Sequence, residues 1–388
     1  MKREKFDFEQ WKDHVYLSCM YGSWKVIDRL CRLLPISPRY IWFESEIDFV
    51  ENTRALYEYM IREPKYQQYR LIWCVDDPSA YPQRKNTIFL PRKRGGFRYS
   101  YYLNRSKFVL LTHPYWLKNW RKGQTVINTC HGNPFKAPRN CLEDCADYVL
   151  ASSETMETFR RQGFGGKCKM AILGAPRLDW LYGQEDYLSD FTEGRNFCKV
   201  IFSMPTFKQS KNWSDSEENA SYSINVVSSI EQLHELNAEL QQRNVLMVCI
   251  IHHLQKMDNV CREKLSNILF LRDEDYGKRG LVMNQMLRSA DALLTDYSGV
   301  FLDYILLDRP IGFYCNSWQE YKRGFAMEDP ENYMPGPRLS TLEDLLQFID
   351  QVIAGEDSYE PMRKQVRDRV HRYQDNQNCR RFLEYFKI

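Results

Sequence analysis

The residue best suited to acid–base chemistry is His131, which follows a short apolar run at residues 125–128 and precedes Gly132. A histidine at the end of a strand and next to glycine lies on a turn whose backbone N–H groups can face a ligand. Imidazole exchanges a proton near neutral pH, which suits a general base. The sequence therefore indicates His131 as a candidate base, and a histidine that only caps the turn is the alternative interpretation.

Polar residues that suit an anion follow two further apolar runs. Thr206 comes shortly after the run at 199–203, and Ser298 comes shortly after the run at 292–295, with Asp303 in the helix expected next. Free N–H groups and the dipole at a helix start favour a phosphate. Ser298 as an ordinary helix cap and Asp303 on a solvated helix face are the alternatives. Because polar residues occur at successive strand ends, we expect them to form one site.

Two more pairs of side chains are of a type that binds ligands. The apolar run at 245–251 ends in His252 and His253, which can donate to an anion. Asp273 and Asp275 follow another run, and their carboxylate oxygens can hold a divalent cation. A solvated acidic loop is the alternative for this pair and the one that the sequence favours. We therefore expect neither an obligatory metal ion nor another cofactor.

The composition excludes several classes of protein. The chain has 388 residues and a formal net charge of +3, which argues against a protein that coats nucleic acid. Its apolar runs are far shorter than the ~20 residues that cross a bilayer, and we expect no secretory signal at the N-terminus. The 12 cysteines include no Cys-x-x-Cys pair, so we expect reduced thiols in a cytosolic or cytosol-facing protein.

The elements that must position these residues alternate between strands and helices along the chain. Several apolar runs are apolar on both faces, as are the strands of a covered parallel sheet. The expected strands are 40–43, 71–75, 108–112, 125–128, 148–152 and 169–174, followed by 199–205, 245–251, 268–271, 292–298 and 310–314. The expected helices are 52–62, 229–242, 284–290 and 300–307, then 341–353, 361–373 and 378–386 near the C-terminus.

This alternation predicts an α/β protein with parallel sheets. Two sets of five or six strands favour two Rossmann-like domains rather than one sheet. We expect one domain at residues 1–190 and a second at 191–388, with the boundary in the polar stretch at 182–196. In such proteins the ligand binds beyond the carboxyl ends of the strands, in the cleft between the domains.

Several motifs occur in an order that resembles one family. The sequence reads Asn-Thr-Cys-His-Gly-Asn-Pro-Phe-Lys at 128–136 and Leu-Thr-Asp-Tyr-Ser-Gly-Val-Phe-Leu-Asp-Tyr at 294–304. Further motifs lie at 43–45, 52–57, 174–179, 205–208, 308–314, 321–325 and 335–337. Through most of its length the chain resembles the CDP-glycerol glycerophosphotransferases, which make teichoic acids and related capsule polymers. The resemblance implies a GT-B-like α/β fold, with two Rossmann-like domains facing across a cleft and C-terminal helices. It also implies that residues 1–190 form the acceptor-binding, membrane-facing domain and that residues 191–388 form the domain that binds the CDP-activated donor.

The resemblance also implies which residues form the site. His131 matches the proposed general base of the family, and His252 matches a second catalytic histidine, with the neighbouring His253 as the alternative. Contacts to the CDP-activated donor are implied for His131, Gly132, Asn133, Pro134, Phe135, Arg177, Pro205, Thr206, Ile250, Ile251, His252, Ser298, Gly299 and Asp303. Arg323 is expected to add a contact to phosphate.

The implied reaction is the attack of an acceptor hydroxyl on the β-phosphorus of CDP-glycerol or CDP-ribitol. This step releases CMP and forms a phosphodiester on a lipid-linked or polymeric acceptor. Two other functions suit the same fold, namely a GT-B glycosyltransferase that uses a nucleotide sugar and a catalytically silent module that binds a polymer or a lipid. Glycerol and ribitol donors, and primase and polymerase modes, are alternatives at this point.

An acceptor of this kind implies a peripheral protein on the cytoplasmic face of the membrane. In the segment 24–34, Trp24, Ile27, Leu30 and Leu34 fall on one helical stripe, and three basic residues lie beside it. A basic amphipathic helix can lie in the membrane interface. A core helix with a solvated basic side is the alternative interpretation.

Overall fold

The structure is a computed structural model of the 388-residue chain. It describes residues 25–92, 96–113, 120–139, 141, 146–165, 167–206, 224–251, 265–315, 321 and 323–388. The chain divides into two compact units: Met1–His131, Asp144–Leu150 and Lys167–Lys169 form the first, and Gly132–Glu143, Ala151–Gly166 and Met170–Ile388 form the second. The predicted domains, 1–190 and 191–388, are a different division of the chain and stay a prediction.

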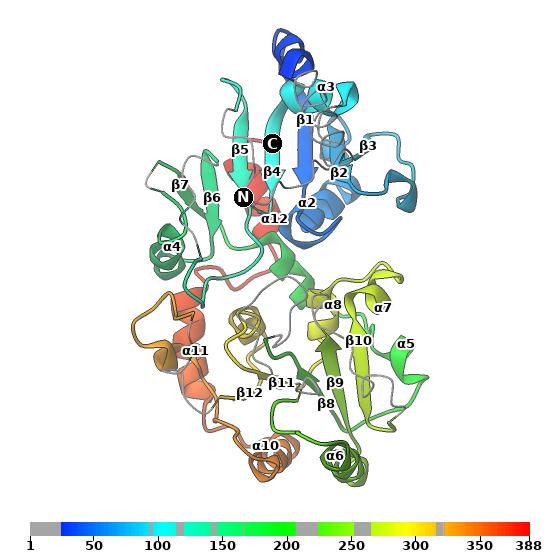
Figure 1. The fold of residues 1–388 in the computed structure, drawn as a ribbon, viewed down its shortest axis with the longest axis vertical. Coiled ribbons are helices and arrows are strands. Elements are labelled where there is room, and N and C mark those ends of the chain that lie inside the picture. The colour runs from blue at the N-terminus through cyan, green and yellow to red at the C-terminus, as the bar shows by residue number, and fades with distance from the viewer. Residues whose placement is uncertain are drawn as a thin grey trace, which may run out of the picture. The chain divides into compact units, whose positions relative to one another are not determined.

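A seven-stranded sheet in the order β3-β2-β1-β4-β5-β6-β7 is the centre of the first unit, although Ala151 and residues 170–172 at its β6–β7 side are assigned to the second unit. The pairs from β3 to β6 are parallel (Figure 1). Its strands are β1 (Ser37–Glu44), β2 (Arg70–Val75), β3 (Thr87–Pro91), β4 (Ser106–Leu111), β5 (Thr125–Asn128), β6 (Tyr148–Ala151) and β7 (Lys169–Ile172). Helices α2 (Glu51–Arg62) and α3 (Phe97–Arg105) belong to the same unit. Trp42, Ile72 and Val109 from three neighbouring strands are fully buried, because these strands are apolar on both faces.

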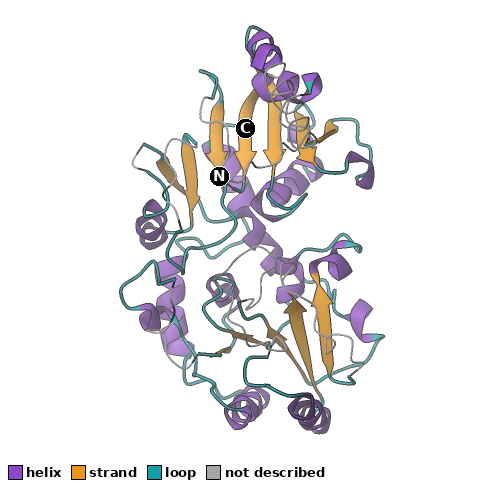
Figure 2. Cartoon of the chain, viewed as in Figure 1, coloured by secondary structure: helices purple, strands orange, loops and turns teal. Residues whose placement is uncertain are grey.

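The second unit is built on a five-stranded parallel sheet in the order β10-β9-β8-β11-β12, whose strands are labelled in Figure 1 and drawn in orange in Figure 2. Its strands are β8 (Lys199–Ser203), β9 (Val245–Ile251), β10 (Ile268–Arg272), β11 (Ala292–Thr295) and β12 (Ile311–Phe313). Its helices are α4 (Glu154–Arg161), α5 (Ser189–Thr192), α6 (Ile230–Gln242), α7 (Asp273–Gly277), α8 (Met283–Leu287), α9 (Phe301–Tyr304), α10 (Leu342–Ala354), α11 (Glu360–Val370) and α12 (Asn378–Tyr385).

Local sequence signals explain where the longer helices of this unit begin and end. Ser229 caps α6, because its hydroxyl accepts a hydrogen bond from the backbone N–H of Gln232 at 3.2 Å. Thr341 and Asp344 form a reciprocal capping box at the start of α10, and Gly355 ends that helix with a left-handed φ of +73°. These signals fix the first residue of α6 and both ends of α10.

The strand order reverses at one point in each sheet. In the second sheet this switch point lies between β8 and β11, which are neighbours although β9 and β10 come between them in the chain. Ligands of open parallel sheets bind beyond the carboxyl ends of the strands at such a point. The segments that leave β8 and β11 begin at Met204 and Asp296, and the hydroxyl of Thr295 donates to the carbonyl of Met204 at 2.9 Å. The loops that follow these two strands are therefore held side by side.

All of the strands predicted from apolar runs are present, but the prediction missed one strand and four helices. Strand β3 is short, ends in a proline and is flanked by polar residues, so its apolar pattern is weak. Helices α3, α4, α5 and α7 were also missed. Among the described residues, no helix combines the length and the apolar character that a membrane span requires.

Candidate active site

The turn that presents His131 is fixed by two asparagine side chains of the first unit. Asn52 of α2 donates through Nδ2 to the backbone oxygens of Thr129 and Cys130, at 2.8 and 2.9 Å. The Oδ1 of Asn128 accepts from the N–H of Cys130 at 2.9 Å, and Cys130 has a left-handed φ of +56°. His131 comes directly after this constrained turn and is exposed. The position therefore suits a base that must meet a substrate.

The loop after His131 belongs to the second unit, where Phe135 anchors it. Phe135 is 1% exposed, and its ring lies edge-on to Phe301 at 4.9 Å and to Phe325 at 5.2 Å between centroids. The carbonyl of Gly132 accepts a hydrogen bond from Arg160 at 2.6 Å. A Cβ added at Gly299 would lie 3.0 Å from the carbonyl oxygen of Asn133. This close approach brings the predicted residues around 133 and 299 together.

Asn133 has hydrogen-bonding capacity that its neighbours leave unused. It is 8% exposed, and its Oδ1 lies 2.7 Å from the hydroxyl of Ser152, which lies equally close to the carbonyl of Val370. One hydroxyl has one proton, so Ser152 donates to only one of the two oxygens. The Nδ2 of Asn133 has no partner among the described residues. A buried amide with a free atom is costly unless a ligand completes its bonding.

The loops after β8 and β11 are joined by the carboxylate of Asp296. Its Oδ1 accepts hydrogen bonds from the N–H and the hydroxyl of Thr206, at 2.8 and 2.7 Å, and from the N–H of Ser298 at 3.0 Å. Asp296 is 5% exposed. Helix α9 begins at Phe301, three residues after Ser298, so in the free protein the Ser298 N–H belongs to this carboxylate network rather than to the helix end.

Lys136 and Asp296 lie among these loops, although neither was predicted as a site residue. The Nζ of Lys136 donates to the hydroxyl of Thr206 at 2.7 Å, so the lysine joins the loop after β5 to the loop after β8. Burial lowers the pKa of Lys136 to about 8, and the negative charge of Asp296 opposes this shift. The available signal was its place at the end of the 128–136 motif.

Arg177 and Asp303 form a buried ion pair in the second unit. Each is 3% exposed, and Oδ2 of Asp303 accepts from Nε and Nη2 of Arg177 at 3.0 and 2.6 Å. The second carboxylate oxygen, Oδ1, is buried and has no partner among the described residues. Asp303 thus keeps one acceptor that a hydroxyl of a ligand can satisfy.

The remaining predicted residues have differing surroundings. Ile250 and Ile251 end β9 and are 8% and 3% exposed, so at most their backbone is available to a ligand. Arg323 is exposed and donates through Nε to the carbonyl of Ala137 at 3.0 Å. Pro134 and Pro205 are half-buried in their loops. His252 and His253 lie outside the described residues.

The acidic pair considered for a metal ion serves as part of a helix start. Oδ2 of Asp275 accepts from the N–H of Arg272 at 2.8 Å, and Asp273 accepts from the hydroxyl of Tyr276, within the first turn of α7. Across the part of the chain that the structure describes, no group of three or more His, Cys, Asp or Glu side chains is arranged to hold a metal ion.

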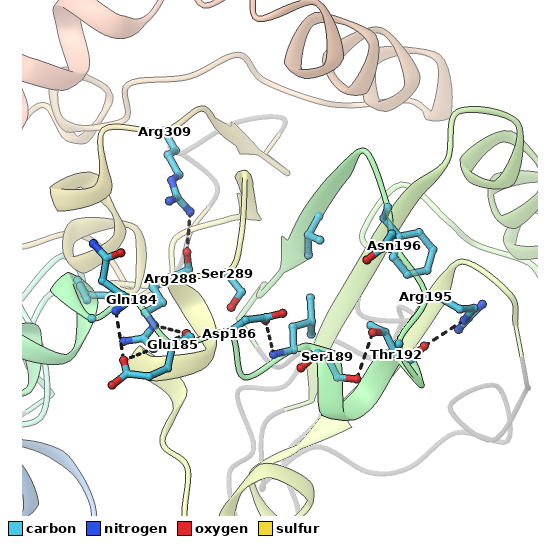
Figure 3. A pocket seen from close by; sticks show the side chains of 16 residues that line it. Gln184, Glu185, Asp186, Ser189, Thr192, Arg195, Asn196, Arg288, Ser289 and Arg309 are labelled. Atoms are coloured by element: carbon cyan, nitrogen blue, oxygen red, sulfur yellow. Dashed lines mark hydrogen bonds and ion pairs between the residues drawn. The ribbon is translucent and has the colours of Figure 1, made fainter.

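A separate pocket of about 520 Å³ has lining residues that come shortly before β8 and β11, whereas Thr206 follows the carboxyl end of β8. Figure 3 shows the side chains that line this pocket. None of the predicted site residues lines it. Its two inner arginines bind main-chain oxygens: Arg288 donates to Glu185 and Trp180, and Arg309 donates to Arg288 and Ala290. Arg288 directly follows α8, so its contacts join the main chain at Trp180 and Glu185 to the end of that helix. Because these arginines bind the protein's own main chain and no predicted site residue lines the pocket, we do not place the reaction there.

A parallel α/β fold with polar loops gathered at a switch point is typical of an enzyme that binds a nucleotide. The family model of CDP-Glycerol:Poly(glycerophosphate) glycerophosphotransferase matches residues 27–386. The chain belongs to this family. The predicted resemblance and the predicted class of function, the transfer of a polyol phosphate from a CDP-activated donor in teichoic acid synthesis, are thereby confirmed.

Individual proteins agree with this assignment. The chain is 25% identical to a teichoic acid poly(glycerol phosphate) polymerase of Bacillus spizizenii, over 86% of this chain and 89% of the relative. It is 24% identical to a teichoic acid poly(ribitol-phosphate) polymerase of the same organism, over 82% of this chain and 52% of the relative. The structure matches the wall teichoic acid polymerase TagF with a TM-score of 0.77 and 19% identity, over 99% and 98% of the two chains. The predicted GT-B-like α/β fold is confirmed.

Proposed function

We propose that this enzyme transfers glycerol phosphate or ribitol phosphate from CDP-glycerol or CDP-ribitol to a hydroxyl of a lipid-linked or polymeric acceptor, with release of CMP. The supporting observation is the polar cluster at the β8–β11 switch point. Asn133 and Asp303 each have a buried polar atom without a partner among the described residues. Because buried polar atoms are nearly always satisfied, these two are best explained by a polar ligand.

In the proposed step, His131 removes the proton from the acceptor hydroxyl as the oxygen attacks the β-phosphorus. The new P–O bond forms as the bond between the β-phosphorus and the bridging oxygen breaks, and the electron pair leaves with CMP. The charge that grows on the CMP phosphate requires donors fixed in advance. We assign this role to the backbone N–H of Gly299, because the hydroxyl of Thr206 and the N–H of Ser298 already donate to Asp296. The free oxygen of Asp303 suits a hydroxyl of the ribose or the polyol.

The test is to incubate the purified chain with CDP-glycerol or CDP-ribitol and a lipid-linked disaccharide acceptor. CMP release with formation of a phosphodiester is the expected result, and the length of the product distinguishes a primase from a polymerase. A glycosidic product from a nucleotide sugar would favour the glycosyltransferase alternative. Binding of the acceptor without CMP release from either donor would favour the catalytically silent module.

We expect that a chelator leaves the activity unchanged. The carboxylates of Asp273 and Asp275 already accept hydrogen bonds within α7, whereas backbone amides of the loop after β11 can supply donors for phosphate. The measurement is CMP release in the presence and absence of EDTA. Strong inhibition that a single type of divalent cation reverses would contradict this expectation and direct attention back to the acidic pair.

A surface of the first unit supports a peripheral position on the membrane. Residues 25–31 are helical, and Val26, Leu30 and Leu33 are 59%, 61% and 80% exposed. Lys25 and Arg29 are exposed in the same segment. Exposed apolar side chains beside basic residues suit an anionic lipid surface. We infer that this segment contacts the cytoplasmic face of the membrane that holds the acceptor.

Replacing both Leu30 and Leu33 by Glu is expected to weaken binding to vesicles that contain anionic phospholipid by at least about tenfold, because two leucines lose their apolar contact. Co-sedimentation with the vesicles measures this effect. Ile353→Glu is the matched control, because Ile353 is 38% exposed on α10 of the second unit. Equal co-sedimentation of the double variant and the wild-type chain would remove this surface from the proposal.

A further inference from the structure

Lys136 is a half-buried cation that the reaction step above does not use. Its side chain is half-buried, with Nζ 2.7 Å from the hydroxyl of Thr206 and 5.6 Å from the centre of the Tyr321 ring. No carboxylate of the described residues lies within the 4.0 Å of an ion pair. An ammonium group has three protons to donate, and one hydrogen bond to Thr206 uses one of them. Two donors are left for a ligand.

The charges around Lys136 show what kind of ligand would be bound. Asp296 is the acid that stabilises its positive charge, but Oδ1 of that carboxylate already accepts three hydrogen bonds from Thr206 and Ser298. Arg139 and Arg323 add positive charge and lower the pKa of Lys136 further. A partly buried ammonium without a paired carboxylate is stabilised by an incoming anion. The three cations together attract a ligand with more than one negative charge.

We propose that Lys136 binds the pyrophosphate of the CDP-activated donor directly, while it keeps its hydrogen bond to Thr206. This inference rests on the proposed function, because it places the donor at the β8–β11 switch point. The ammonium is a compact point charge, and two of its protons can meet oxygens of both phosphates. Thr206, which donates to Asp296 and accepts from Lys136, then acts as a positioning residue for the ammonium group.

Binding of the donor should therefore be linked to uptake of a proton. In the free protein the pKa of Lys136 is about 8, so close to half of the molecules have a neutral amine at pH 8. A bound pyrophosphate favours the charged form and raises this pKa. Between the free and the bound pKa the protein gains a proton when the donor binds, whereas well below pH 8 the lysine is already charged. The affinity for the donor is thus expected to fall as the pH rises above 8.

Calorimetric titration with CDP-glycerol, in two buffers of different protonation enthalpy, measures this uptake. CDP-glycerol is the suitable probe because its pyrophosphate, esterified at both ends, has no proton to exchange near pH 8. The wild-type protein is expected to take up about half a proton at pH 8. Lys136→Met should abolish the uptake and weaken binding by about 10- to 100-fold, as is typical when a hydrogen bond to a charged group is lost.

Two variants make the result specific. Lys136→Arg keeps a permanent charge, so it should bind the donor within a few-fold of the wild-type protein but without proton uptake at pH 8. Lys278→Met is the matched control, because Lys278 is an exposed lysine of the same unit, and it should behave as the wild-type protein. The Lys136→Arg result keeps the proposal falsifiable if Lys136→Met fails to fold, which circular dichroism would reveal.

Two outcomes would overturn the inference in different ways. If the wild-type protein binds and turns over CDP-glycerol, but Lys136→Met binds it equally well or keeps the proton uptake, the role of Lys136 is wrong and the proposed function stands. If the folded wild-type protein binds neither CDP-glycerol nor CDP-ribitol, the proposed function fails, and the role of Lys136 fails with it.

Discussion

His131→Ala is expected to lower kcat for CMP release by about 10²–10⁴-fold, the usual effect of removing a general base. An alcohol is a weak nucleophile, and in the proposed mechanism the imidazole alone removes its proton. The fold should survive the change, because His131 is exposed and because Asn52, Asn128 and the left-handed Cys130 define the turn before it.

The measurement is single-turnover release of CMP from saturating CDP-glycerol, together with the dissociation constant of the donor. A base that acts in the chemical step affects kcat far more than donor affinity. His234→Ala is the matched control, since His234 is an exposed histidine on α6 and its loss should leave both quantities unchanged. Turnover of His131→Ala at the wild-type rate would remove His131 as the base.

The strands of this protein were predictable because most of them are apolar on both faces. Strand β9 has no exposed residue from Val245 to Ile251, so its sequence is one uninterrupted apolar run. Strand β3 lacks such a run: Pro91 ends it, and only Thr87 and Leu90 are buried. A short edge strand of this kind looks like a loop in the sequence, which is why it was missed.

The sequence indicated candidate residues for the site, whose roles stay predictions, but it did not indicate their contacts. The sequence shows that Thr206 and Ser298 follow strands, but it does not show that β8 and β11 are neighbours, because β9 and β10 separate them in the chain. That adjacency is what allows Asp296 to bind both loops. Lys136 lies at the same place, because its Nζ donates to the hydroxyl of Thr206. Its position in a sequence motif does not reveal this contact.

The same limit applies to the ion pair between Arg177 and Asp303, which are 126 positions apart in the sequence. Both residues were predicted to contact the donor, and Asp303 was otherwise expected on a solvated face. In the structure each is 3% exposed, and the two side chains bind one another. A residue of this kind affects the stability of the fold as well as the ligand, and a variant at either position must be interpreted with both effects in mind.

Asp303→Ala is expected to lower the free energy of unfolding by about 3–5 kcal/mol, because it leaves the guanidinium of Arg177 buried without its carboxylate. Urea denaturation followed by circular dichroism measures this change. Combining Arg177→Met with Asp303→Leu should restore much of the lost stability, because apolar side chains of similar volume replace the whole pair. Asp344→Ala is a control for loss of a carboxylate at an exposed helix cap and should cost about 0.5–2 kcal/mol.

The double variant also separates stability from catalysis. If the free oxygen of Asp303 accepts a hydroxyl of the donor, the Arg177→Met and Asp303→Leu combination should stay folded and still bind CDP-glycerol at least about tenfold more weakly, since a hydrogen bond to a charged group is lost. A stable double variant with wild-type affinity for the donor would show that the pair has a structural role alone. An Asp303→Ala variant as stable as the wild-type chain would instead contradict the buried ion pair itself.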